Sequence, residues 1–143
     1  MTSKILLDTN ILVDFMIAGR PGNAAARRII EIACEGACEG CAFAGSLKDA
    51  YYIASKNIGE RDSRRYVRLF LAMLNILPLG APECRIAAYS DEPDFEDGLV
   101  RAAAETNKVD FIITRDVEAF QHSKVRSMSA ETYLELFDRP NGE

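Results

Sequence analysis

The feature that most constrains the fold is a regular alternation of short apolar runs with longer segments of helical periodicity. The runs that read as strands lie at residues 4–8, 41–44, 76–79, 109–114 and 124–128. The segments that read as helices lie at residues 11–18, 23–36, 47–57, 61–75, 82–90, 94–106 and 131–137. Parallel strands need crossover connections, and these are usually helical. The order therefore predicts the α/β class, as a three-layer α/β/α sandwich around a central, mainly parallel sheet.

Size and composition fit one globular unit. The chain has 143 residues, of which 48% are hydrophobic and 27% are charged, which is ordinary usage for a domain with a packed core. We expect a single domain over residues 1–143. Its 17 Lys and Arg against 22 Asp and Glu give a net charge of −5, so a polyanion must be met by local groups and not by bulk attraction.

The sequence predicts no membrane span. The longest nearly apolar stretch, residues 69–82, contains Asn75, Pro78 and Pro82 and is shorter than the roughly 20 residues that a spanning helix needs. The first residues also lack the hydrophobic region of a secretory signal. We therefore expect a cytoplasmic protein. In that reducing compartment the cysteines are expected as free thiols or metal ligands; they are Cys34, Cys38, Cys41 and Cys84.

Acidic residues follow two of the predicted strands. Asp8 ends the first run, and Asp116 comes shortly after the apolar residues 111–113. Because ligands of parallel sheets sit beyond the carboxyl ends of the strands, the two carboxylates are expected at one edge. Asp97 and Asp49 come from the predicted helices and could join them. Carboxylates gathered at close range repel, and a hard divalent cation such as Mg²⁺ or Mn²⁺ would compensate them.

Each acid also has a structural interpretation. Asp8 could simply cap the following helix. Asp94, Asp97 and Asp49 are expected in first helical turns, where the helix dipole favours anions whatever the function, and Asp97 could also pair with Arg101. Four further acids are interpreted as surface or capping residues outside the site: Asp14, Asp91, Asp110 and Glu118.

Four blocks of sequence carry a family resemblance. They are ILLDTNILVD at 5–14, SLKDAYYI at 46–53, DFEDGLV at 94–100 and FIITRD at 111–116. In this order and spacing the chain resembles the PIN-domain nucleases, and among them the VapC-type toxins of type II toxin–antitoxin pairs. The resemblance implies metal-dependent hydrolysis of RNA, with Mg²⁺ or Mn²⁺ as cofactor, and a cognate antitoxin and a homodimer as further partners. Carried over by position, it implies an acidic quartet of Asp8, Asp49, Asp97 and Asp116, with Asn10 and Thr114 as polar supports.

Two positions depart from the family pattern. Asp49 stands where many members carry Glu, and its side chain is one methylene shorter, so its contact with a metal could run through water. Gly98 replaces the small Ala often found beside the third acid, which weakens that helix by up to ~1 kcal/mol. Neither change removes a carboxylate.

Basic residues suggest where RNA could bind. In the segment 61–75 the apolar residues share one helical face, which we expect to be buried: Val67, Phe70, Leu71 and Leu74. An arginine ridge lies on the opposite face; it consists of Arg61, Arg64, Arg65 and Arg68. It suits an RNA backbone or an acidic partner, although a solvated face is the alternative. Arg115 could contact the scissile phosphate or form an ordinary surface ion pair.

Other functions remain open. The spacing Cys34-x₃-Cys38-x₂-Cys41 equals the cluster signature of radical S-adenosylmethionine enzymes, and Cys84 or His122 could complete a Zn²⁺ site. We interpret His122 as an exposed loop residue, since a metal-activated water needs no histidine base.

The sequence does not match the phosphatase pattern, because Asn10 stands where that pattern needs a second Asp. It does not match the response-regulator pattern either, which needs paired acids after the first strand and a late lysine, for which only Lys124 is available. A catalytically silent binding module and a stand-alone RNA-processing nuclease are the remaining alternatives.

Overall fold

The structure is a computed structural model that describes residues 2–138. Its strands are β1 (Ser3–Leu7), β2 (Cys38–Phe43), β3 (Asn75–Leu77), β4 (Phe111–Ile113) and β5 (Arg126–Met128). Its helices are α1 (Thr9–Met16), α2 (Asn23–Cys34), α3 (Ala44–Met73), α4 (Ala81–Ala88), α5 (Phe95–Thr106) and α6 (Ala130–Phe137), with a 3₁₀ turn η1 (Val117–Phe120).

The strands form one five-stranded parallel sheet in the order β3-β2-β1-β4-β5. The chain first builds outward from β1 through β2 to β3, and then returns to the other side of β1 with β4 and β5. The strand order therefore reverses between β1 and β4, which is where open α/β sheets place their ligands. The predicted fold class is confirmed, and β3, which Pro78 follows, lies at one edge of the sheet, where a proline removes no ladder hydrogen bond.

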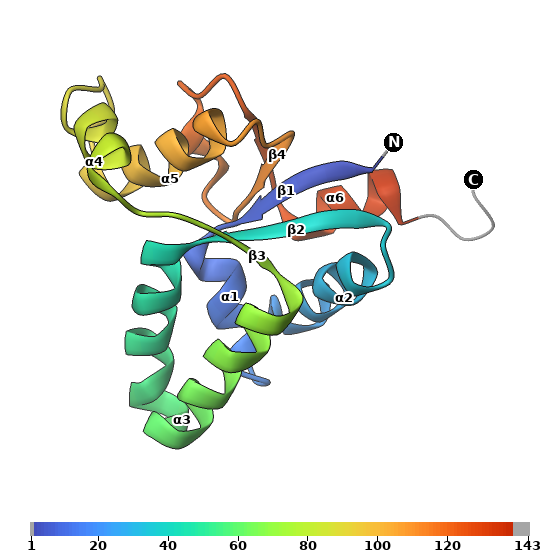
Figure 1. Ribbon diagram of the computed structural model, residues 1–143. Coiled ribbons are helices and arrows are strands. Elements are labelled where there is room, and N and C mark those ends of the chain that lie inside the picture. The colour runs from blue at the N-terminus through green and yellow to red at the C-terminus, as the bar shows by residue number, and fades with distance from the viewer. Residues whose placement is uncertain (1, 139–143) are drawn as a thin grey trace.

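The sheet separates two apolar layers. Along β1, Ile5 and Leu7 pack into one core cluster with residues of α1, α2, α3 and α6, while Leu6 packs into the other with α5 and η1. Successive side chains of a strand point to opposite faces, so these three buried residues serve both layers. Figure 1 shows α1, α2 and α3 on one side of the sheet and α4 and α5 on the other. The three-layer prediction is confirmed.

A glycine divides α3 into the two helices expected from the sequence. Gly59 has φ of +85°, a left-handed conformation that glycine adopts without strain. Figure 1 shows the two halves folding back toward each other as a helical hairpin. The predicted start at residue 47 is wrong, because the helix begins at Ala44 and Ser46 is buried inside it. Asp49 consequently lies in the second turn and not in the first.

Gly98 has a packing role that the sequence did not reveal. A Cβ atom at this position would lie 3.3 Å from Cβ of Ala87 and 3.4 Å from Oγ of Ser90. The glycine therefore lets α5 approach α4 closely, and α5 is the helix that carries Asp97.

The cysteines do not gather. Cys38 packs into the cluster on one face of the sheet and Cys41 into the cluster on the other, while Cys34 and Cys84 are exposed. All four are free thiols, which is one of the two states expected. Because the sheet lies between Cys38 and Cys41, the cluster-like spacing does not assemble a site.

No helix within residues 2–138 combines the length and the apolar character needed to cross a membrane.

Candidate active site

Asp8 occupies the junction between β1 and α1. Its Oδ1 accepts a hydrogen bond from the backbone N of Thr9 (2.8 Å), and its Oδ2 accepts one from Oγ1 of Thr114 (2.9 Å). Its own backbone N donates to the carbonyl of Ile113 (2.9 Å), which ties the ends of β1 and β4 together. Burial raises the pKa of the Asp8 carboxyl, the two hydrogen bonds oppose that rise, and the charge of Asp116 adds to it. Asp8 therefore caps α1 and also faces a second carboxylate.

The hydroxyl of Thr114 joins the polar groups at this edge. Besides donating to Asp8, it accepts from the backbone N of Asp116 (3.0 Å) and from Nδ2 of Asn10 (3.3 Å). One donor and two lone pairs are then all in use. Oδ1 of Asn10 in turn accepts from the backbone N of Arg115 (3.2 Å). Asn10 and Thr114 thus hold the residues after β4 against the start of α1.

Asp97 reaches the same region from α5. It lies in the first turn of that helix, where Oδ1 of the capping residue Asp94 accepts from its backbone N (3.1 Å). Burial, and after it the negative charges of Asp94, Asp8, Asp116 and Glu92, together raise the pKa of the Asp97 carboxyl to about 6. The fold therefore brings Asp8, Asp97 and Asp116 within range of one another's charge.

The expected pair between Asp97 and Arg101 does not form. Arg101 instead contacts Oε1 of Glu92 (2.9 Å), Oδ1 of Asp91 (3.3 Å) and Oε2 of Glu105 (3.0 Å). The i, i+4 partner Glu105 and the loop before α5 occupy the guanidinium. This leaves the carboxylate of Asp97 without a cation beside it in the described part of the chain.

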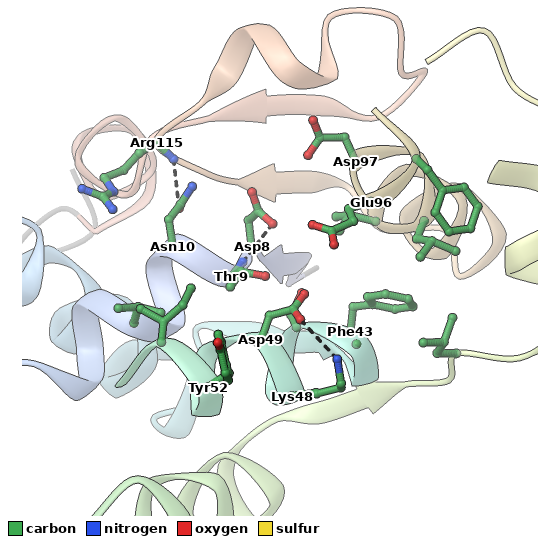
Figure 2. Close-up of a pocket in the computed structure, with 18 of the residues that line it drawn as sticks. Asp8, Thr9, Asn10, Phe43, Lys48, Asp49, Tyr52, Glu96, Asp97 and Arg115 are labelled. Carbon is green, nitrogen blue, oxygen red and sulfur yellow. Dashed lines mark hydrogen bonds and ion pairs between the residues drawn. The ribbon is translucent and has the colours of Figure 1, made fainter. Parts of the chain in front are cut away.

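A cavity of about 620 Å³ opens beside these acids. Asp8, Asp97 and Asp49 line it, together with Glu96, which the sequence analysis did not single out. Figure 2 shows Asp49 reaching up from α3 toward Asp8, while Glu96 and Asp97 come from α5 on the other side. Asp116 lies outside this lining and is exposed. Three of the four acids of the expected quartet therefore share the cavity wall, and the fourth, Asp116, acts on Asp8 and Asp97 through its charge.

The acids do not form a closed metal cage. Within residues 2–138 there is no group of three or more His, Cys, Asp or Glu side chains arranged so that it could hold a metal ion. Mg²⁺ keeps several of its waters and is often bound through only one or two carboxylates. The oxygen donors and the mutual repulsion at Asp8 and Asp97 suit such a hydrated divalent cation.

Asp14 was expected at the surface or in a cap, and this is wrong. Its side chain is only 1% exposed and forms ion pairs with Nε of Arg20 (2.8 Å) and Nε of Arg115 (3.3 Å). Both arginines line the cavity. The one available signal was that Asp14 is the only charged residue in α1, whose other members from Ile11 onward are apolar and buried.

The arginine ridge lies elsewhere. Arg61, Arg65 and Arg68 border a separate hollow on the second half of α3, and Nη2 of Arg64 pairs with Glu60 at 2.9 Å. None of the four lines the acidic cavity, whereas Arg115 does. His122 is exposed, in agreement with its interpretation as a loop residue.

The family model described as PIN domain matches residues 4–118. The chain belongs to the PIN domain family. No curated protein matches it.

Solved structures share the fold at low sequence identity. The toxin VapC20 of Mycobacterium tuberculosis is 15% identical, with a TM-score of 0.67 over 80% of this chain and 92% of the other. VapBC2 from Rickettsia felis, bound to a DNA fragment from its promoter, is 14% identical, with a TM-score of 0.65 over 87% and 97%. A toxin–antitoxin complex from Klebsiella pneumoniae is 20% identical, with a TM-score of 0.65 over 88% and 97%.

Proposed function

We propose that this protein is a ribonuclease that depends on Mg²⁺ or Mn²⁺ and hydrolyses RNA phosphodiester bonds, and that it is the toxin of a toxin–antitoxin pair. Membership of the PIN domain family supports the nuclease assignment. The similar VapC20 is described as a toxin that cleaves the sarcin-ricin loop, and other similar structures are toxin–antitoxin complexes. The proposal treats residues 1–143 as one domain.

One observation carries the proposal. Asp8, Asp97 and Asp116 come from three separate segments. Burial raises the pKa values of Asp8 and Asp97, and the charges of neighbouring acids, Asp116 among them, add to the rise. A structural role would not require such repulsion, and a cation would relieve it.

The roles of the residues follow from their surroundings. Asp8 and Asp97, on the cavity wall, would hold the cation directly, with Asp116 beside them and the shorter Asp49 acting through a water molecule. A bound divalent ion would lower the pKa of a water molecule and neutralise charge on the phosphate. Thr114 and Asn10 keep Asp8 and the segment after β4 in a fixed orientation through the hydrogen bonds described above.

An antitoxin is proposed to dock over the cavity. Exposed apolar side chains border the carboxylates on its rim: Tyr52 is 60% exposed, Ile53 40% and Phe95 50%. A peptide with an apolar face and a basic residue would cover this rim and meet the acids. A homodimer belongs to the same proposal, and the oligomeric state of the purified protein tests it.

The test is cleavage of an RNA pool with Mg²⁺, with Mn²⁺ and with EDTA. We expect cleavage only with metal, and a loss of at least about 100-fold in Asp8→Asn and in Asp97→Asn, because direct ligands matter more than the outer groups whose loss costs about 10–100-fold. The matched control is Asp110→Asn. Asp110 is exposed and precedes β4, at the opposite end of the strand from Asp116. We expect the Asp110→Asn variant to cleave RNA like wild type.

Contrary results are equally clear. Equal activity of wild type and Asp8→Asn, or cleavage in EDTA, would refute the assigned site. Calorimetry without Mn²⁺ uptake would refute the metal. RNA or antitoxin binding without cleavage under any metal would favour the silent binding module, and the absence of an adjacent antitoxin reading frame would favour a stand-alone nuclease.

A further inference from the structure

Two arginines share one buried carboxylate beside the proposed catalytic site. Asp14 is 1% exposed and binds Nε of Arg20 through Oδ1 and Nε of Arg115 through Oδ2. The two guanidinium groups come from the turn after α1 and from the segment after β4, so the pairing joins distant parts of the chain. One carboxylate between two guanidiniums leaves one positive charge uncompensated at this point of the cavity wall.

The turn that carries Arg20 is held in place by the backbone. Nδ2 of Asn23 donates to the carbonyl of Asp14 (2.8 Å), and the backbone N of Arg20 donates to the carbonyl of Ile17 (3.2 Å). Gly22 leaves room for the carboxylate, because a Cβ atom there would overlap Oδ2 of Asp14. Asp14 and Arg20 are therefore set in a preorganised arrangement that a ligand would not have to assemble.

Most donors of the two guanidiniums remain available. Each has five N–H groups, and the contact with Asp14 is made through Nε. Within residues 2–138 the terminal nitrogens of Arg20 and Arg115 have no acidic or hydrogen-bonding partner, and their side chains are 30% and 44% exposed. Terminal guanidinium nitrogens are the donors that bind phosphate oxygens in pairs.

We propose that Arg20 and Arg115 form a binding subsite for a phosphodiester group of the RNA strand next to the one that is cleaved, and that Asp14 is their positioning residue. The identity of the ligand as RNA rests on the proposed function. Both arginines line the same cavity as Asp8 and Asp97. Figure 2 shows Arg115 on the opposite side of Asp8 from Asp97, so a strand that crosses the carboxylates meets a cation beyond them.

An acidic peptide is the less suitable ligand. The rest of the cavity wall carries Asp49, Glu96 and Asp97, which would repel it. A phosphodiester strand meets the same acids, but the divalent cation of the proposed reaction would accompany it there and compensate them.

The experiment measures binding and not cleavage. Fluorescence anisotropy of a labelled single-stranded RNA 12-mer, titrated at a fixed Ca²⁺ concentration over a series of NaCl concentrations, gives the Kd and its salt dependence. Ca²⁺ compensates the cavity acids as a hard divalent cation, and gel electrophoresis verifies that the RNA stays intact. For single strands the slope of log K against log salt changes by about 0.7 for each phosphate contact. We expect Arg20→Gln and Arg115→Gln each to weaken binding about tenfold, and the double variant to flatten the slope by about 0.7, because the two arginines share one phosphate.

The control is Arg126→Gln. Arg126 is exposed at the start of β5, at the far end of the sheet from the cavity, and also carries one positive charge. The Kd of the Arg126→Gln variant and the salt dependence of that Kd are expected to match those of wild type. If the double variant also matches wild type, or if Arg126→Gln has the same effect as the cavity variants, the subsite is refuted.

Asp14 is tested by a double-mutant cycle. In an Asp14→Asn background the effect of Arg20→Gln on the Kd is expected to shrink below about threefold, because an unanchored guanidinium contributes less. A merely structural role of Asp14 would leave that effect at about tenfold. Thermal denaturation identifies any variant that fails to fold, and Asp14→Glu, which keeps the charge, is expected to restore part of the coupling.

The outcomes separate the subsite from the proposed function. Wild-type protein that binds RNA through these arginines but never cleaves it refutes the nuclease and keeps the subsite. Cleaving protein whose KM is unchanged in the double variant refutes the subsite and keeps the nuclease. If the double variant Arg20→Gln/Arg115→Gln loses the binding of an oligoglutamate peptide that wild type binds, while its RNA binding is intact, the RNA assignment is refuted in favour of a protein ligand.

Discussion

Replacing Asp97 by Asn is expected to stabilise the protein at alkaline pH when no divalent metal is present. The folded structure raises the pKa of this carboxyl from its ordinary value of 3.8 to about 6, through burial and the neighbouring acids. Because the folded pKa lies above the unfolded one, the stability that this group contributes is fully present below about pH 4 and is lost as the pH rises through about 6. Asn cannot ionise, so the variant should escape that loss.

The magnitude follows from the two pKa values. Each pH unit between them corresponds to about 1.36 kcal/mol, so the difference between 3.8 and about 6 sets a maximum of about 3 kcal/mol. Water screens this half-buried group, and the variant also gives up the favourable interaction of a carboxylate with the N-terminal helix dipole, worth about 0.3–1 kcal/mol. We therefore expect a gain of about 1–2 kcal/mol at pH 8. For a domain of this size that is a rise of about 3–8 °C in Tm.

The assay is thermal denaturation in EDTA from pH 4 to pH 8, for wild type, Asp97→Asn and Glu96→Gln. Glu96 is the matched control, since it is exposed, lies in the same helical turn and interacts with the same dipole. The curves of wild type and Asp97→Asn should coincide near pH 4 and diverge above pH 6, while Glu96→Gln should follow wild type or fall slightly below it. A variant that is less stable than wild type at pH 8, or a constant offset at all pH values, would refute the reasoning.

Two further substitutions test the supports of the site and the fold. Thr114→Val removes a hydroxyl that hydrogen-bonds to Asp8, Asn10 and the backbone N of Asp116. Urea denaturation should show that the free energy of unfolding falls by about 1–3 kcal/mol. RNA cleavage should also fall, and Thr114→Ser should restore both. Gly59→Ala places a side chain at φ +85° and should cost about 1–2 kcal/mol by the same denaturation assay. Unchanged or increased stability, as Gly→Ala gives at an ordinary helical position, would show that the kink relaxes.

Much of the fold could be predicted because its signals are local. Two strands could be identified from their own residues: the apolar run before Asp8 and the run ending at Ile113. The division of α3 into two helices was predicted because residues 47–57 and 61–75 each show helical periodicity, and Gly59 lies between them. The predictions were wrong where packing against neighbouring elements decides which residues are buried. Leu71 was expected on the buried face of its helix and is 56% exposed, since the stripe that packs runs through Phe70 and Leu74.

The candidate site also contains features that the sequence predicted and features that it did not. That Asp8, Asp97 and Asp116 would converge was inferred from strand ends and helix starts, and the structure brings their charges into mutual range. Whether they bind metal and cleave RNA stays a proposal. The pairing of Asp14 with Arg20 and Arg115 could not be inferred, because it depends on how a turn folds back and on which loop arrives beside it.

By itself the sequence determined the order of strands and helices and the carboxylates at the ends of β1 and β4, since periodicity and chain direction are local properties. Only the tertiary structure decided which charges meet. It buried Asp14 between two arginines, occupied Arg101 with Glu92 and Glu105, and left Asp97 among acids. The physical reason is that electrostatic interaction depends on distance and burial in space, and both are set by packing between segments far apart in the chain.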